Sequence, residues 1–181
     1  VGYTIIVLAV LGTLISVYKF VTIGLEGRRV RAQLKSGEPS TSNGLGRVLS
    51  VYRANRAADV ETLELRLEEA ILKETSALGR GTQLIKVFSV IAPLLGLLGT
   101  VTGMIQCFQQ MTLFGTGDPR LMADGIAEAL VTTVLGLVTA IPLTLFYSSI
   151  SDQTRGLSEI LEERSIGMVA EQSEEKKKKK I

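Results

Sequence analysis

The sequence has no histidine, no tryptophan and a single cysteine, Cys107. One cysteine excludes a disulfide within the chain, and the lack of histidine and of a cysteine pair excludes the usual zinc ligand sets. No serine or cysteine stands beside a base that could activate it, so a membrane enzyme has little support. We therefore expect a protein that is not an enzyme, with no metal site, no cofactor and no nucleic-acid partner.

Charged residues are also rare in three long apolar blocks, at 1–18, 87–105 and 126–147. With a helix rise of about 1.5 Å per residue, each block spans roughly 27–33 Å, which matches a bilayer core of ~30 Å. Lys19 and Glu128 lie near block ends rather than at mid-depth. The blocks predict an all-α membrane protein with three transmembrane helices. A signal peptide at block one is disfavoured, because it lacks a basic start and a small-residue cleavage site.

The distribution of positive charge predicts the orientation of the chain. Eleven Lys or Arg residues lie within 24–86 and seven follow residue 147, whereas the link between blocks two and three holds only Arg120. Positive residues concentrate on the cytoplasmic side of membrane proteins. We therefore predict a periplasmic N-terminus, long cytoplasmic helical extensions and a cytoplasmic C-terminus. Because the chain begins at Val1 without a methionine, we expect it to be the membrane part of a longer protein.

These observations divide the chain into six predicted segments. They are a first transmembrane helix (1–25), a cytoplasmic helical loop (26–81), a second transmembrane helix (82–112), a periplasmic turn (113–124), a third transmembrane helix with its cytoplasmic extension (125–172) and a basic tail (173–181).

The predicted cytoplasmic parts have helical patterns of their own. After a connector rich in Gly, Ser and Pro at 36–46, apolar residues recur every three or four positions and predict one amphipathic helix over 45–78. Gly79 and Gly81 are expected to end it. A similar spacing continues past residue 148, and we expect the two amphipathic pieces to pack against each other beneath the membrane. The lysine tail is either disordered or in contact with anionic lipid.

Small residues recur four apart in the second and third blocks, in rows that include Gly96, Gly99 and Gly103, and Gly136. Such rows let helix backbones approach closely, because lipid supplies no hydrophobic drive between helices. Close packing without chemistry accounts for the glycines. Pro93 and Pro142 each remove one backbone hydrogen bond within a predicted helix.

Polar residues inside the spans are the candidates for function. Thr100, Thr132 and Thr133 belong to a hydroxyl-rich surface that is more typical of a pore lining than of a lipid face, although a membrane threonine often bonds only its own helix. Glu128 is the one acid within a predicted span; it marks either a route for protons or cations, or an interfacial residue that reaches water. Because no ionisable residue lies at mid-bilayer, a proton path would need a titratable group from another subunit.

Three stretches in order, APLLGLLGTVTGMIQCF, GDPRLMADGIAEAL and VTTVLGLVTAIPLTLFY, resemble the signature of the ExbB/TolQ/MotA proton-channel family over residues 92–147. Three predicted spans fit the ExbB/TolQ branch, since flagellar MotA has four. The resemblance implies a homopentamer in the inner membrane of Gram-negative bacteria. Its second and third helices would line a pore that holds two copies of an ExbD-like partner, whose aspartate carries the proton.

The resemblance also implies roles for particular residues. The pore threonines of the family fall on Thr100 and Thr133, and its acid at the start of the third helix falls on Glu128. Proton flow would rotate the partner as a molecular motor and transmit force to a TonB-like protein. The resemblance favours an ExbB-type subunit, while a TolQ-type subunit of the Tol–Pal system, a longer TtpC-type variant and a non-conducting membrane scaffold stay as alternatives. The sequence does not distinguish protons from sodium ions.

Overall fold

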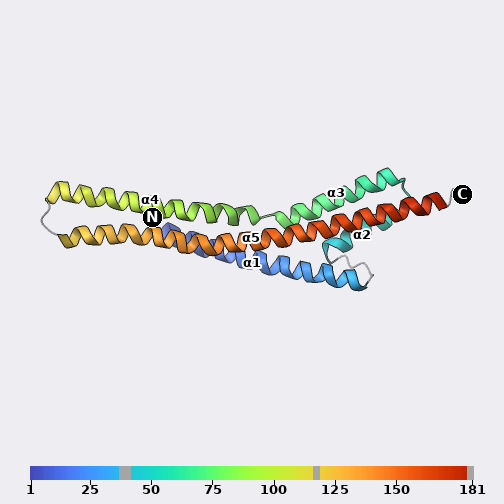
Figure 1. Ribbon diagram of the computed structural model, residues 1–181, viewed down its shortest axis with the longest axis horizontal. Helices are drawn as coiled ribbons and strands as arrows, with labels where there is room; N and C mark the ends of the chain where they lie inside the picture. Colours follow the sequence, from blue (N-terminus) through green and yellow to red (C-terminus); the bar gives the residue numbers. More distant parts are fainter. Residues whose placement is uncertain (37–41, 116–118, 179–181) are drawn as a thin grey trace. The chain divides into compact units, whose positions relative to one another are not determined.

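The computed structural model describes residues 1–36, 42–115 and 119–178, and five helices account for most of them (Figure 1). The helices are α1 (Gly2–Ser36), α2 (Gly44–Ala54), α3 (Val60–Gly79), α4 (Thr82–Phe114) and α5 (Pro119–Lys178). The described residues contain no strand, which confirms the predicted all-α class. Part of the predicted connector (37–41), part of the predicted outer turn (116–118, which includes Asp118) and the end of the lysine tail (179–181) lie outside the described residues.

Three stretches of the described chain are long and apolar enough to cross a membrane, which confirms the three predicted spans. They lie within Gly2–Leu34, Val60–Leu113 and Met122–Lys178. The protein is therefore a helical membrane protein.

Short polar side chains and glycines set the helix boundaries. Asn43 caps α2 by accepting a hydrogen bond from the Gly46 backbone N–H at 2.9 Å, and Asp59 caps α3 by accepting one from the Thr62 N–H at 3.0 Å. Gly81 has a φ of 85°, a left-handed conformation that separates α3 from α4. The expected helix end at Gly79 and Gly81 is confirmed.

The prediction of one amphipathic helix over 45–78 is wrong in its middle. The helix stops at Ala54, and a second one begins at Val60. The Asn55 side chain donates to the Val51 carbonyl at 2.8 Å, and Asp59 then caps the new helix. Both side chains form hydrogen bonds with backbone groups at the break, in place of the bonds of a continuous helix. Asn and Asp favour helix ends for this reason.

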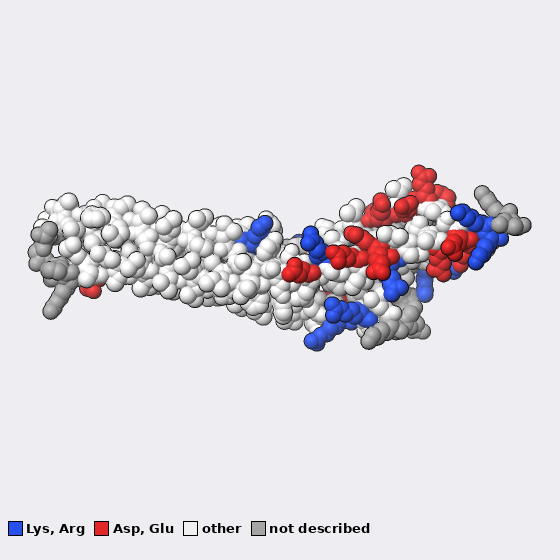
Figure 2. Space-filling model, viewed as in Figure 1, with Lys and Arg blue, Asp and Glu red and all other residues white. Residues whose placement is uncertain are grey.

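The chain divides into two compact units, which are described separately. Unit 1 comprises Val1–Tyr18 with Gly81–Ser148, and unit 2 comprises Lys19–Arg80 with Ser149–Ile181. In unit 1 the first part of α1 packs on its neighbours through a small residue: a Cβ at Gly12 would lie 3.0 Å from the Leu143 methyl groups and 3.3 Å from the Phe88 ring. Most large apolar side chains of unit 1 point outward, and the face shown in Figure 2 carries almost no charge there.

Unit 2 has a conventional apolar interior. Leu63 and Leu67 of α3 and Leu161 of α5 are almost completely buried, as is Val48 of α2. A polar contact also ties the link between α2 and α3 to α5: the Gln172 amide donates to the Arg56 carbonyl at 2.9 Å. The expected packing of the two amphipathic pieces against each other is confirmed.

An ion-pair cluster joins three helices of unit 2. The Arg47 guanidinium donates to both carboxylate oxygens of Glu74, at 2.6 and 2.7 Å, and lies 3.6 Å from Glu26. The hydrogen bonds to Glu74 raise the pKa of Arg47 above its usual value. The bidentate contact joins α2 to α3, and the longer ion pair with Glu26 joins α2 to α1.

Candidate functional site

The site lies in unit 1, where α4 and α5 meet at a seam of glycines and threonines. The carbonyl oxygen of Gly96 on α4 accepts two hydrogen bonds from α5: one from the Thr133 hydroxyl at 3.1 Å and one from the Thr132 hydroxyl at 3.3 Å. Thr132 shares its proton with the Ala129 carbonyl of its own helix, at 2.7 Å. Two hydroxyls from one helix thus converge on a single backbone oxygen of the other.

Glycine makes this convergence possible. A Cβ at Gly96 would lie 3.0 Å from both the Thr132 carbonyl oxygen and the Thr133 Cα, so any other residue there would press against backbone. On the opposite helix, a Cβ at Gly136 would lie 2.7 Å from the Ala92 carbonyl oxygen and 3.1 Å from the Gly96 Cα. The two glycines face each other and bring the helix backbones into contact.

The other two glycines of the predicted rows extend the seam along α4. A Cβ at Gly99 would overlap the Thr132 side chain, and one at Gly103 would lie 2.7 Å from the Ala129 Cβ. Pro93 lies inside α4 and Pro142 inside α5, as the sequence predicts. Each removes one donor from its helix without ending it.

The threonines singled out from the sequence are placed differently from one another. Thr133 bonds across the seam, whereas the Thr100 hydroxyl donates to the Leu97 carbonyl of its own helix, at 2.7 Å. Thr102 likewise donates to the Leu98 carbonyl of α4, at 2.9 Å. Within one copy of the chain, therefore, Thr132 and Thr133 belong to one cluster at Gly96, and no hydrogen bond in the described residues joins Thr100 to it.

A polar pocket of about 440 Å³ adjoins this seam. Glu128 of α5 lines it and is exposed, together with Thr132 from the Gly96 cluster. Two further polar residues, Gln106 and Gln110 of α4, also line the pocket and were missed by sequence reasoning. Their signal is the spacing of four that they continue from Thr102, which places all three on one face of α4.

The pocket holds little that could bind a metal. No group of three or more His, Cys, Asp or Glu side chains comes together anywhere in the described residues. The single thiol, Cys107, is buried at the pocket wall, where its Sγ lies 3.8 Å from the Met122 carbonyl oxygen. What the site offers is one carboxylate, hydroxyls and amides: groups that bind water and small cations or pass protons.

The fold and this seam define the class: a helical membrane protein whose polar groups gather where two spans meet. Residues 30–163 match the model of the MotA/TolQ/ExbB proton channel family. This match covers most of the chain, so the chain belongs to that family, and the resemblance seen in the sequence is confirmed.

Named relatives agree with this membership. The chain is 40% identical over 100 residues to the putative biopolymer transport protein ExbB-like 1 of Synechocystis sp., covering 54% of this chain and 39% of the relative. It is 39% identical over 89 residues to the putative biopolymer transport protein ExbB homolog of Methanothermobacter thermautotrophicus, covering 49% and 31%. It is 36% identical over 93 residues to the biopolymer transport protein ExbB of Salmonella typhimurium, covering 51% and 38%. The chain thus matches less than half the length of each relative.

Proposed function

We propose that the chain is the ExbB-type energiser subunit of a TonB system. Five copies would form a ring in the inner membrane of a Gram-negative bacterium, with two copies of an ExbD-like partner in the pore. The ring would conduct protons and couple the proton motive force, through a TonB-like protein, to transport across the outer membrane. Family membership and the ExbB names of its relatives support this proposal. In this role the chain is not an enzyme.

The observation that carries the proposal is the convergence of Thr132 and Thr133 on the Gly96 carbonyl. The Thr133 hydroxyl proton is engaged in that contact, and the Thr132 proton is shared between Gly96 and the Ala129 carbonyl, so each oxygen presents its lone pairs as acceptors. An acceptor oriented in this way suits a group that arrives as a proton donor, such as a hydronium ion, a water molecule or a protonated carboxylic acid. Glu128 in the adjoining pocket would supply negative charge at the entrance.

Because no ionisable side chain lies at mid-span, we expect the proton carrier to come from another chain. Glu128 lies near one end of its apolar block, and α4 holds no acid between Thr82 and Phe114. A carboxyl group in a low-dielectric pore is stable when it is protonated or paired. A partner's protonated carboxyl group that donates a hydrogen bond to the Thr133 oxygen would meet this requirement. In a ring that turns this side of α4 inward, Thr100 would face the same group.

The membrane orientation in this proposal follows the positive-inside rule. Unit 2, which holds most of the basic residues, would lie in the cytoplasm, and the pocket that Glu128 lines would open toward the periplasm. Membrane lipids would cover the outward-facing apolar side chains of unit 1.

Replacing Thr133 by Val tests the proposal, because Val keeps the shape of the side chain and removes its oxygen. Two controls match it: Thr133→Ser keeps the hydroxyl, and Thr144→Val makes the same change on α5 where the hydroxyl donates to the Ala140 carbonyl of its own helix. Each variant is measured with the co-expressed partner, for assembly, for proton flux in proteoliposomes and for iron–siderophore uptake in cells. We expect Thr133→Val to abolish flux and uptake while the ring still assembles, and both controls to remain active.

Normal uptake in Thr133→Val would refute the role of the seam. An assembled wild-type ring without proton flux would favour the non-conducting scaffold, which the same glycine rows would serve. Flux with restoration of a Tol–Pal defect, but not of a TonB defect, would favour the TolQ-type alternative.

A further inference from the structure

Unit 2 contains an open groove with glycines on both of its sides. The groove, of about 660 Å³, runs between α1 and α5 and is lined by Gly24 and Gly27 on one side and Gly156 on the other. A Cβ at Gly156 would meet nothing within 4 Å, and one at Gly27 or Gly24 would meet only a single side-chain atom, at 3.7 or 3.8 Å. Unlike Gly96 and Gly136, these glycines have no neighbour in their own chain that requires their small size. We call this feature the glycine groove.

The rim of the glycine groove is basic. Arg28 and Arg31 line it from α1, and both are exposed. Neither guanidinium has an ion-pair partner among the residues that the structure describes. Asp152 of α5 also lines the groove. The groove therefore suits an occupant with apolar side chains whose carboxylates meet the α1 side, because the Asp152 carboxylate on α5 would repel a second negative charge.

A ridge with the complementary chemistry lies on α3 of the same chain. Leu65 and Leu72 are 61% and 70% exposed, although both are large and apolar. They are seven residues apart, hence on one face, about 10 Å apart along the axis. The buried face of α3 carries Leu63 and Leu67, so Leu65 and Leu72 point away from the interior of unit 2. We call this feature the α3 ridge.

Acidic residues flank the α3 ridge. Glu61, Glu64 and Glu68 are exposed, and none of them has an ion-pair partner in the described part of the chain. Figure 2 shows acidic side chains gathered over α3 and basic ones over α1. The α3 ridge and the glycine groove are therefore complementary. The ridge has two exposed leucines beside three carboxylates, and the groove has open space beside two guanidinium groups.

We propose that the glycine groove of one copy receives the α3 ridge of a second copy of this chain. This inference rests on the homo-oligomer of the proposed function and identifies one contact between its subunits. The two surfaces differ, so the contact is head-to-tail, and a contact of this kind closes into a ring when its rotation permits. The ridge leucines would fill the space above Gly27 and Gly156, while Arg28 and Arg31 would pair with the ridge carboxylates.

Cross-linking tests the contact in the full-length chain in membranes, with Cys107→Ser as the background. A variant with both Leu72→Cys and Gly156→Cys is treated with a short bis-maleimide reagent. A head-to-tail ring predicts a ladder of products beyond the dimer, whereas either cysteine alone should give only background. A ladder would support the proposal. The absence of products from assembled oligomers would overturn it, as would products that stop at the dimer.

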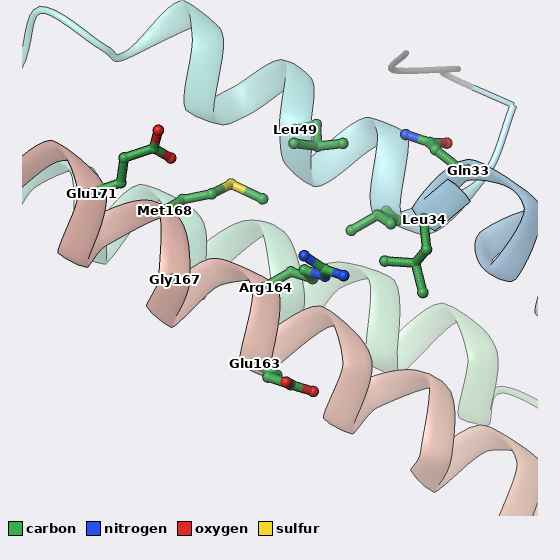
Figure 3. A pocket seen from close by; sticks show the side chains of 9 residues that line it. Gln33, Leu34, Leu49, Glu163, Arg164, Gly167, Met168 and Glu171 are labelled. Carbon is green, nitrogen blue, oxygen red and sulfur yellow. The ribbon is translucent and has the colours of Figure 1, made fainter. Parts of the chain in front are cut away.

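The matched control replaces Gly167 instead of Gly156. Gly167 also lies on α5, about three turns further along, and a Cβ there would meet nothing within 4 Å. It lines a separate pocket, together with Leu49, Met168 and other residues (Figure 3). Leu72→Cys with Gly167→Cys should give no ladder. A ladder of equal yield from this control would overturn the proposed position of the ridge.

Charge exchange provides a second, independent measurement. The double variant Arg28→Glu/Arg31→Glu places like charges together and should weaken association by about tenfold or more, measured as the oligomer fraction by native mass spectrometry. Adding Glu64→Arg/Glu68→Arg should restore it. Restoration would support the contact. An unchanged oligomer in Arg28→Glu/Arg31→Glu would overturn the contact. If this variant still conducts protons, the proposed function stands without the contact.

An anionic lipid is the competing occupant of the glycine groove, and the same variants distinguish it. If phosphatidylglycerol co-purifies with the wild type and is lost from Arg28→Glu/Arg31→Glu while the oligomer is unchanged, the groove binds lipid and the proposal is overturned. A wild-type chain that remains monomeric in membranes would overturn both this proposal and the ring of the proposed function.

Discussion

At the α4–α5 seam of unit 1, the atoms in contact belong to backbone, glycine and threonine, and the large apolar side chains point outward. In unit 2 the arrangement is reversed: large apolar side chains such as Leu67 and Leu161 fill the interior, and charged ones cover the outside. The same chain therefore uses two ways of joining helices. The difference follows from the solvent. Burying a leucine side chain away from water is favourable, whereas burying it away from lipid gains no free energy, because lipid tails are equally apolar.

The contrast matters for function. A seam built from backbone and hydroxyls brings polar groups together without a charged side chain, which suits a site inside a membrane. An interior built from leucine side chains holds helices together in water but leaves no polar path. The predictions that follow test whether the two units respond to substitution as this comparison requires.

The largest effect is expected for Gly136→Leu in unit 1. The new side chain would meet the Ala92 carbonyl oxygen and the Gly96 Cα, and backbone atoms cannot move aside as a flexible side chain can. We expect a loss of at least about 3 kcal/mol in the free energy of unfolding, or no folded protein. Thermal unfolding in detergent, followed by circular dichroism, measures it. Gly167→Leu is the control, because its position is open, and an equal loss there would contradict the comparison.

A buried leucine of unit 2 should come next. Leu67 is fully buried, so Leu67→Ala leaves a cavity and should cost about 2–5 kcal/mol. The matched change in unit 1, Leu145→Ala, removes the same atoms from a side chain that is 67% exposed and should have little effect on stability. The same unfolding measurement compares them. If Leu145→Ala were as costly, the outward-facing residues of unit 1 would be part of an interior after all.

A smaller effect is expected from the ion-pair cluster of unit 2. Arg47→Met removes the guanidinium from Glu74 and Glu26 and should cost about 1 kcal/mol at low salt, and less at 1 M salt. Arg66→Met is the control, since Arg66 pairs with the exposed Glu69 one turn away, at 3.2 Å. Unfolding at two salt concentrations separates them. A salt-independent loss at Arg47 would indicate lost packing rather than lost charge.

The smallest effect is expected at the α3 cap, and it depends on pH. The hydrogen bond from the Thr62 N–H lowers the pKa of the Asp59 carboxyl below its usual value. Stability from Asp59 is therefore fully present above about pH 4 and declines as the pH falls through the lowered value. Asp59→Ala should lower the stability slightly at pH 7, while Asp59→Asn should keep the cap and remove this pH dependence. A pH dependence unchanged in Asp59→Asn would show that another group causes it.

The sequence predicted the spans and the glycine rows because both depend on local patterns. Apolar length identifies a membrane helix, and small residues four apart identify a face that can approach another backbone. The break between α2 and α3 was missed because the apolar spacing continues on both sides of it, and Asn55 and Asp59 are two polar residues among many. Their effect depends on which backbone groups they reach.

The details of the Gly96 cluster could not be predicted, for a different reason. The acceptor is a backbone carbonyl, and every residue has one, so the sequence carries no signal for it. Which threonine crosses the seam depends on the register of α4 against α5, and this register separates Thr133 from Thr100. Gln106 and Gln110 have a periodic signal with Thr102, but an uncharged amide costs less in an apolar segment than a carboxylate and is therefore a weaker sign of function.

The Gly96 contact also has a consequence for genetics. Because the accepting oxygen belongs to the main chain, no substitution at position 96 can delete it; substitutions there change only the space around it. A mutational scan would therefore record Gly96 as a position sensitive to size. The chemical phenotype would appear 36 and 37 positions later, at Thr132 and Thr133. Suppressors of a Gly96 allele should accordingly be sought among smaller residues on α5, and those of a Thr133 allele among residues that restore a hydroxyl.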